Sequence, residues 1–264
     1  MSTTTVNESP KKSSLPVWLG VSGALFVLGL VAWIIQLRQG IGATSLSNLN
    51  AWGIYIAGFI FFMGLSAGML VLASLPVLFN LPRFRPYSKL AAFVALISLI
   101  VGGLFILVDI GKPDRLWRIV RFGQLGSPML WDLLLTIAYL LVATVFLRRL
   151  QTAKSDAALK PVALLALFAG LADGLTAFVF ASQVGREFWF SAIQPMAFFT
   201  AALASAGALL LLLMIGLKAA GYNVLECCDL APLAGLTAAT VGLGLLLEAS
   251  EIITHWFSRS AAEL

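Results

Sequence analysis

Long apolar runs alternate with short polar stretches along almost the whole chain. Each run is long enough to cross the hydrocarbon core of a bilayer, which takes roughly 20 helical residues. The predicted spans cover residues 16–37, 51–79, 87–109, 129–147, 161–183, 192–217 and 231–253. This pattern predicts an all-α, polytopic membrane protein with about seven or eight transmembrane helices.

The chain begins with a polar stretch, residues 1–15, which contains Lys11 and Lys12. We expect this stretch to be disordered and residues 16–264 to form a single transmembrane helical domain. The first apolar run is too long for the core of a signal peptide, and no convincing cleavage site follows it, so we interpret it as an uncleaved span.

The polar stretch after the third span differs from the others in its density of functional groups. Residues 109–131 contain two carboxylates, four cations, two Trp and two Pro. Pro113 and Asp114 are typical of the first turn of a short helix. A helical projection separates two sides: the cations Lys112, Arg115, Arg118 and Arg121 on one, and Leu116, Trp117 and Val120 on the other. The pattern predicts an amphipathic helix at the membrane surface, although a basic loop in the headgroups fits the composition equally well.

Composition supports the membrane assignment and excludes several kinds of cofactor. The chain is 60% hydrophobic and 11% charged, with a mean hydropathy of +0.98. Its single histidine, His255, excludes a di-haem cytochrome of the b type, which needs paired axial histidines. The two cysteines, Cys227 and Cys228, are adjacent and cannot form a Cys-x-x-Cys framework. We therefore expect no haem, iron–sulfur cluster or other metal in this chain, and its basic residues show no nucleic-acid footprint.

The distribution of Lys and Arg between the two sides of the membrane predicts the orientation. Ten of them fall on the side of the N-terminus and seven on the other, which favours a cytoplasmic N-terminus. The stretch after the third span contributes four of those seven and so departs from the rule. A surface that receives an extrinsic partner would explain this exception, with Lys112, Arg118 and Arg121 as predicted docking residues.

Ionisable residues inside the predicted spans are the next candidates for function. Asp132 lies about one turn inside the fourth span, and Asp173 lies near the middle of the fifth. Glu248, Glu251 and His255 are spaced three and four residues apart and share one face of the seventh helix. Such groups are costly in lipid and are by default functional hypotheses, but structural acids and a polar seam between helices remain open alternatives.

The second span carries small residues at helical spacing, including a Gly-x-x-x-Gly at Gly64 and Gly68. This spacing allows another helix to approach closely, so packing is their simplest role. Tyr55 at the mouth of this span, and Trp131 and Tyr139 on the fourth span, are typical interfacial anchors. Rings of this kind can also hold a quinone head group, and the residues alone leave the choice open.

Several motifs occur in an order that resembles the NrfD/PsrC family of polysulfide-reductase-like integral membrane subunits. They are Trp52-Gly53-x-Tyr55, Gly64-Leu65-Ser66-Ala67-Gly68, Asp109-x-Gly111-Lys112-Pro113-x-Arg115-x-Trp117, Ser127-Pro128-Met129-x-Trp131 and Asp173-Gly174-x-Thr176. The resemblance covers about residues 50–217. Three features depart from the family pattern. Relatives commonly have eight or more spans, the shortest relatives have no equivalent of the first span, and many longer relatives place a His-Ser pair where Asp173-Gly174 stands here.

The resemblance implies a quinone-reactive membrane anchor subunit of a respiratory oxidoreductase in a prokaryotic cytoplasmic membrane. Its second to fifth spans, about residues 51–183, would form a four-helix bundle that binds menaquinone or ubiquinone non-covalently. A ferredoxin-like iron–sulfur subunit would dock beside it and connect to a molybdopterin enzyme or a multihaem cytochrome. The chain would be an enzyme only as a subunit of that complex.

The resemblance also suggests roles for individual residues. Tyr55, Arg115, Trp131 and Tyr139 would bind the quinone, and Asp109, Asp132 and Asp173 would exchange protons with it. Glu248, Glu251 and His255 would form a proton path. One rival interpretation is a secondary transporter or proton channel that uses the same acids, but such proteins typically show internal repeats or broken helices, which this sequence lacks. A purely structural anchor with no quinone of its own remains an open alternative.

Overall fold

The computed structural model describes residues 15–40, 44, 52–153, 155–173, 176–181, 191–221 and 230–262. Within these ranges all regular structure is helical. The α-helices are α1 (Leu15–Gln39), α2 (Ile54–Leu78), α3 (Arg85–Asp109), α4 (Leu116–Phe122), α5 (Pro128–Thr152), α6 (Asp156–Asp173), α7 (Thr176–Ala181), α8 (Gln194–Ala219) and α9 (Ala231–Ala262), and the 3₁₀ turns are η2 (Pro82–Phe84) and η3 (Pro113–Arg115). Residues 1–14 of the predicted N-terminal tail lie outside the described residues.

The structure confirms the all-α membrane architecture and the seven predicted spans. Seven helical segments in the described part of the chain are long and apolar enough to cross a membrane. The fifth comprises α6 and α7 together, over Ala157–Ala181. Predicted helix ends are less accurate: α5 continues five residues beyond the predicted 147, and α9 ends at 262 rather than 253. Hydropathy marks the part of a helix inside the hydrocarbon, whereas helices continue into the headgroup region.

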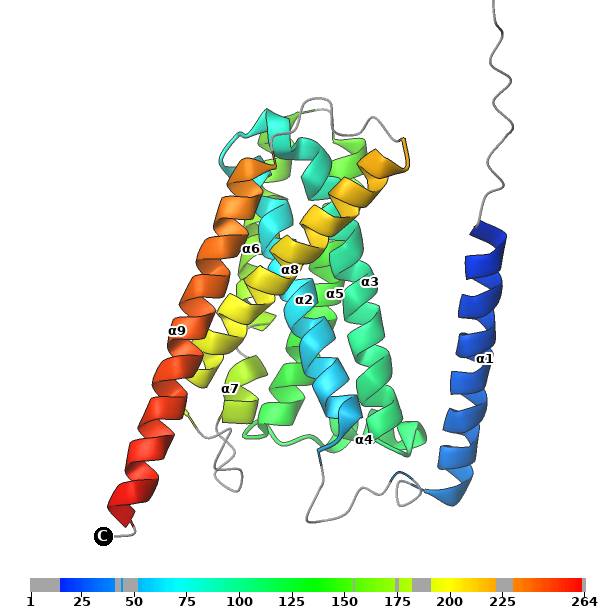
Figure 1. Cartoon of the computed structure of the whole chain (residues 1–264). Coiled ribbons are helices and arrows are strands. Elements are labelled where there is room, and N and C mark those ends of the chain that lie inside the picture. Colours follow the sequence, from blue (N-terminus) through cyan, green and yellow to red (C-terminus); the bar gives the residue numbers. More distant parts are fainter. Residues whose placement is uncertain are drawn as a thin grey trace, which may run out of the picture.

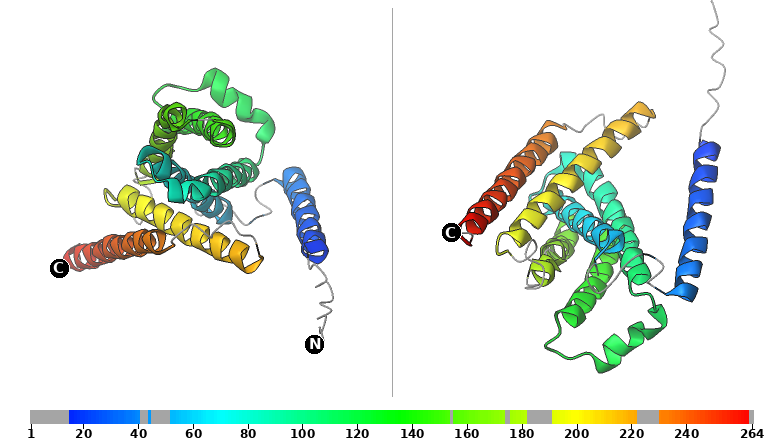
Figure 2. Two further views of the ribbon diagram at one scale, coloured as in Figure 1. Left: turned by 90° about the horizontal axis from the view of Figure 1, so that it is seen from above. Right: turned by 60° about the horizontal axis from the view of Figure 1, so that its bottom comes forward.

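The α2 helix forms the centre of the molecule. In its apolar window 72% of residues are buried, against 33% or less in every other span. It packs against α3, α6 and α8, while α5 packs against α3 and α6. Helices α2, α3, α5 and α6 therefore close a four-helix bundle, as the sequence predicts, and the view from above shows them together (Figure 2).

Small residues bring α2 and α8 into close contact. A Cβ atom added at Gly68 would overlap the carbonyl oxygen of Ala202 and lie 2.8 Å from the Cβ of Ala206. One added at Gly64 would lie 3.1 Å from the ring of Phe198. The Gly-x-x-x-Gly motif thus provides the close approach expected from its spacing, and α8 is the helix that fills it.

The first and last helices lie at the edges of the bundle (Figure 1). None of the apolar window of α1 is buried, and only 6% of that of α9. Helix α8 crosses α2 obliquely, and α9 packs against α8 on the side away from α1. Helix α4 lies at the end of the bundle where α3 ends and α5 begins, which is the lower end in Figure 1.

Candidate functional site

The segment after α3 turns sharply and connects α3 to α5 through η3 and α4, which in the view from above lies beside the bundle (Figure 2). Gly111 adopts a φ of +67°, a left-handed conformation that favours glycine. The backbone N–H of Lys112 then donates to the carbonyl of Ile110 at 2.8 Å, and Pro113 starts the 3₁₀ turn η3. This glycine and proline pair redirects the chain from a membrane span into α4.

Helix α4 presents different faces to the bundle and to its surroundings. Leu116 and Ile119 line a cavity, whereas Trp117 is 51% exposed. The guanidinium groups of Arg118 and Arg121 each lie 5.8 Å from the centre of the Trp117 ring, at cation–π distance. The sequence pattern grouped Trp117 with Leu116, but the structure places it with the exposed cations.

The cavity lies beneath this segment and has a volume of about 490 Å³. Its walls come from five helices: the start of α2, the end of α3, α4, the start of α5, and α7. Phe59 and Phe180 belong to the wall, with ring centres 6.4 Å apart, and Trp52 meets Phe180 edge-on at 5.4 Å. A volume of this size lies within the range of roughly 300–1,000 Å³ typical of small-molecule sites.

Two of the predicted acids line this cavity. Asp109 reaches it from the last residue of α3 and Asp132 from the second turn of α5. The Asp109 Oδ1 atom is buried and has no hydrogen-bond partner among the described residues. Buried polar atoms are normally hydrogen-bonded, so an oxygen without a partner is an unusual feature in a residue that lines a cavity. Ser127 and Thr136 add hydroxyl groups to the lining.

The four residues assigned to quinone binding, Tyr55, Arg115, Trp131 and Tyr139, lie outside the lining. The Tyr55 hydroxyl donates to Oε1 of Gln36 at 3.0 Å. Trp131 is 51% exposed, and its indole N–H donates to the carbonyl of Leu125 at 2.8 Å. Arg115 is exposed, as are Lys112, Arg118 and Arg121. The structure therefore brings together Asp109 and Asp132 but not the aromatic and basic residues assigned with them.

The fourth of these residues, Tyr139, is buried inside the bundle. Its hydroxyl lies 2.8 Å from Oγ of Ser66, which itself donates to the carbonyl of Ala95 at 2.7 Å. This network joins α2, α3 and α5 at the level of Ser66. This geometry favours a packing role for Tyr139, and its predicted contact with the quinone stays a prediction.

Replacing Tyr139 with Phe is expected to lower the free energy of unfolding by about 1 kcal/mol, because the ring stays and one buried hydrogen bond is lost. Thermal unfolding in detergent measures this loss. Quinol turnover in an assembled complex should stay within about twofold of the parent, since a barrier change of about 0.4 kcal/mol or less corresponds to that factor. A loss of turnover with unchanged stability would instead support direct contact between Tyr139 and the quinone.

The remaining predicted residues lie elsewhere in the chain. Glu248 is exposed on α9, and Glu251, one turn on, has a buried Oε1 with no hydrogen-bond partner in the described ranges. Neither they nor His255 line the cavity, and the proton path stays a prediction. Asp173 ends α6, and its side chain lies outside the described part of the structure.

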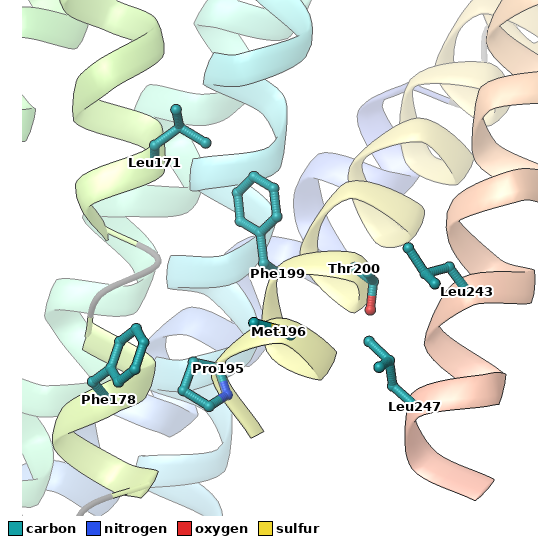
Figure 3. A pocket seen from close by; sticks show the side chains of 8 residues that line it. All are labelled: Leu171, Phe178, Pro195, Met196, Phe199, Thr200, Leu243 and Leu247. Atoms are coloured by element: carbon teal, nitrogen blue, oxygen red, sulfur yellow. The ribbon is translucent and has the colours of Figure 1, made fainter. Parts of the chain in front are cut away.

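A second cavity, of about 430 Å³, lies between α6, α7, α8 and α9 (Figure 3). Its lining is apolar apart from Thr200, whose hydroxyl donates to the carbonyl of Ala197 at 2.8 Å. The close-up shows Phe178, Phe199 and Leu247 around this space. It offers room for a hydrocarbon chain but carries no acid among its described lining residues, so the first cavity is the better candidate for chemistry.

Sequence patterns did not reveal several residues of the first cavity. Phe59, Gly103, Ile106 and Phe180 lie inside apolar spans and look like ordinary lipid-facing or core residues. Thr136 follows Asp132 by four residues on α5 and therefore shares its face. That spacing is the one signal that could have identified it.

The model of the polysulphide reductase NrfD family matches residues 42–246, which is most of the chain. The chain belongs to the NrfD family. The match includes α2 to α8 and therefore every described residue that lines the cavity.

This NrfD chain is also similar to individual proteins. A Halobacterium salinarum protein assigned as a membrane subunit of dimethyl sulfoxide reductase is 38% identical over 75% of the chain. A selenate reductase subunit of Mesobacillus selenatarsenatis is 28% identical over 90%, and the Hdr-like menaquinol oxidoreductase integral membrane subunit of Archaeoglobus fulgidus is 31% identical over 72%. The alignments cover 51%, 64% and 48% of these relatives, so the chain spans about half to two thirds of their length.

Proposed function

We propose that this chain is the quinone-reactive membrane subunit of a respiratory oxidoreductase complex. The observation that carries the proposal is the cavity at the end of the bundle, in which a buried oxygen of Asp109 has no hydrogen-bond partner among the described residues. The names of the relatives support it, since three are subunits of reductases or of a menaquinol oxidoreductase.

The lining fits a quinone head group in shape and chemistry. Trp52, Phe59 and Phe180 provide flat, apolar walls that would orient a planar ring and exclude water from it. Asp109 and Asp132 line the same space. A quinone bound there would supply two-electron redox chemistry coupled to two protons.

The two carboxyl groups would handle the protons of that reaction. Asp109 would accept a hydrogen bond at Oδ1 from a ring hydroxyl and take its proton as general base, or donate the proton in the reverse direction. Asp132, from the facing helix α5, would serve the second ring oxygen. We expect either menaquinone or ubiquinone to be the natural ligand.

The electrons would pass to or from an attached subunit. Lys112, Arg118 and Arg121 are exposed cations of the same segment that contributes Leu116 and Ile119 to the cavity wall. The guanidinium groups of Arg118 and Arg121 lie against the exposed ring of Trp117. Such a surface suits an acidic partner, because complementary charge orients docking. We infer that the partner is a ferredoxin-like iron–sulfur subunit, which connects in turn to a molybdopterin enzyme or a multihaem cytochrome.

This proposal places the cavity end of the bundle on the outer face of a prokaryotic cytoplasmic membrane. The N-terminus would then lie in the cytoplasm, because α1 ends at the same end of the molecule as the cavity (Figure 1). The count of basic residues favours the same orientation.

Filling the cavity tests the proposal. Gly103 lines it and has no atom within 4 Å of the position that a Cβ would take, so a larger side chain can enter without displacing backbone. Gly103→Leu is expected to raise the KM for decylubiquinol or menadiol by about tenfold, equivalent to roughly 1.4 kcal/mol of binding. The measurement is quinol turnover by the assembled complex.

Gly242→Leu is the matched control, because Gly242 is exposed on α9 and likewise has open space around it. Its KM should equal that of the parent complex. If Gly103→Leu also leaves the KM unchanged while the complex assembles normally, the cavity is not the quinone site.

A further inference from the structure

One residue of α1 differs from its neighbours on that helix. Gln36 is 5% exposed, although none of the apolar window of α1 is buried. The adjacent Ile35 and Leu37 are 47% and 39% exposed. The side chain of Gln36 is therefore buried against the bundle, although the helix that carries it is peripheral.

Both ends of the Gln36 amide are hydrogen-bonded to the bundle. Its Nε2 group donates to the carbonyl of Val108 at 3.2 Å, and its Oε1 accepts from the Tyr55 hydroxyl at 3.0 Å. These two bonds link α1, α2 and α3. Burying an amide in an apolar environment costs free energy unless the amide is hydrogen-bonded. The Gln36 side chain is therefore held in the one orientation that keeps both bonds.

The bond to Val108 lies at the C-terminal turn of α3. The last four carbonyls of an α-helix lack partners within the helix. The Val108 carbonyl accepts from the backbone N–H of Gly111 at 3.4 Å, and the Gln36 amide adds a second, shorter hydrogen bond to it. Val108 immediately precedes Asp109 and does not belong to the cavity lining, whereas Ile106, Asp109 and Ile110 do. Gln36 is thus hydrogen-bonded to the backbone of the residue that precedes Asp109, in the turn that brings this acid to the cavity.

We propose that Gln36 and Tyr55 are positioning residues that hold the C-terminal turn of α3 so that Asp109 reaches into the cavity. This inference rests on the proposed function of Asp109. It gives Tyr55 a role different from the direct quinone contact that the motif suggested, because its hydroxyl acts through Gln36. It also gives α1 a part in the reaction, although α1 contributes no described residue to the cavity lining.

A double-mutant cycle separates this role from simple structural support. Four assembled complexes are compared with decylubiquinol or menadiol as substrate: parent, Gln36→Leu, Asp109→Asn and the double variant. Gln36→Leu should lower kcat about tenfold and leave KM within about twofold, because a displacement of less than about 1 Å at a reacting group is enough for such a loss. In the Asp109→Asn background, Gln36→Leu should cause no further loss.

Two more variants complete the design. Gln39→Leu makes the same change at an exposed position of the same helix and should leave kcat unchanged. Tyr55→Phe removes one of the two hydrogen bonds and should lower kcat about threefold, less than Gln36→Leu, with KM unchanged. If Gln36→Leu fails to assemble, Tyr55→Phe alone and in the Asp109→Asn background decides the question.

Parent-like kcat in Gln36→Leu overturns the inference, as does an equal loss in the presence and absence of Asp109. A rise in KM with Tyr55→Phe would also overturn it, in favour of direct contact between Tyr55 and the quinone. If Asp109→Asn itself keeps full turnover, the proposed role of Asp109 fails. If Asp109→Asn loses turnover and Gln36→Leu does not, only the positioning role fails.

Discussion

Quinol turnover is expected to fall by about a hundredfold when Asp109 is replaced with Asn, the lower end of the range for loss of a general acid or base. Asn keeps the size of the side chain and lines the same cavity, but it cannot exchange a proton. The loss should therefore appear mainly in kcat, with KM for the quinol changed little. Steady-state turnover with decylubiquinol or menadiol, in an assembled complex, measures it.

Asp114→Asn is the matched control for this substitution. Asp114 lies further along the chain on η3 and is exposed, so its replacement should leave kcat within about twofold. Asp132→Asn should lower kcat as well, since Asp132 reaches the same cavity from α5. Full turnover in both Asp109→Asn and Asp132→Asn would exclude these carboxyl groups from the chemistry.

The largest loss of stability is expected from Gly68→Ala. A methyl group at this position would overlap the carbonyl of Ala202, and backbone atoms cannot move aside as a flexible side chain can. Overpacking of this kind typically costs roughly 1–3 kcal/mol, and we expect about 3 kcal/mol here because α2 and α8 must separate. Thermal unfolding of the purified protein in detergent measures the change.

Two further glycines provide a graded comparison. Gly64→Ala should cost less than Gly68→Ala, because the atoms it meets belong to the ring of Phe198 and the Cβ of Ala202 rather than to backbone. Gly242→Ala meets no atom within 4 Å and should leave stability unchanged or raise it by about 0.5–1 kcal/mol. Equal stability of the Gly68 and Gly242 variants would contradict the close packing of α2 and α8.

The sequence predicts the architecture well because its signals are local. Hydropathy identifies each span, and Gly64 and Gly68 indicate a close helix contact through their spacing alone. The helix that fills this contact could not be predicted, because α8 begins only at Gln194, far along the chain from Gly68, and no local pattern identifies it. The Gly111-Lys112-Pro113 turn was also predictable, because glycine and proline act on their own backbone.

The candidate site is only partly predictable, because a cavity depends on which faces of several helices meet. Asp109 and Asp132 were identified as candidate acids, and both line the same cavity. Tyr139 looked equally suited to a quinone, but Ser66 on a neighbouring helix accounts for its hydroxyl. Gln36 gave no signal beyond being a polar residue near a span end, since its partners Tyr55 and Val108 lie 19 and 72 residues away.

Photoaffinity labelling with an azido-quinone tests the central claim most directly, because it reports where the ring binds without requiring turnover. The complex is labelled, the chain is digested, and the modified peptides are identified with and without excess unlabelled quinone. We predict competable labelling of residues 103–110 at the end of α3 and 127–136 at the start of α5, the two segments that contribute Asp109 and Asp132 to the cavity. Competable labelling confined to the apolar space between α8 and α9, around Met196 and Leu247, would contradict the account.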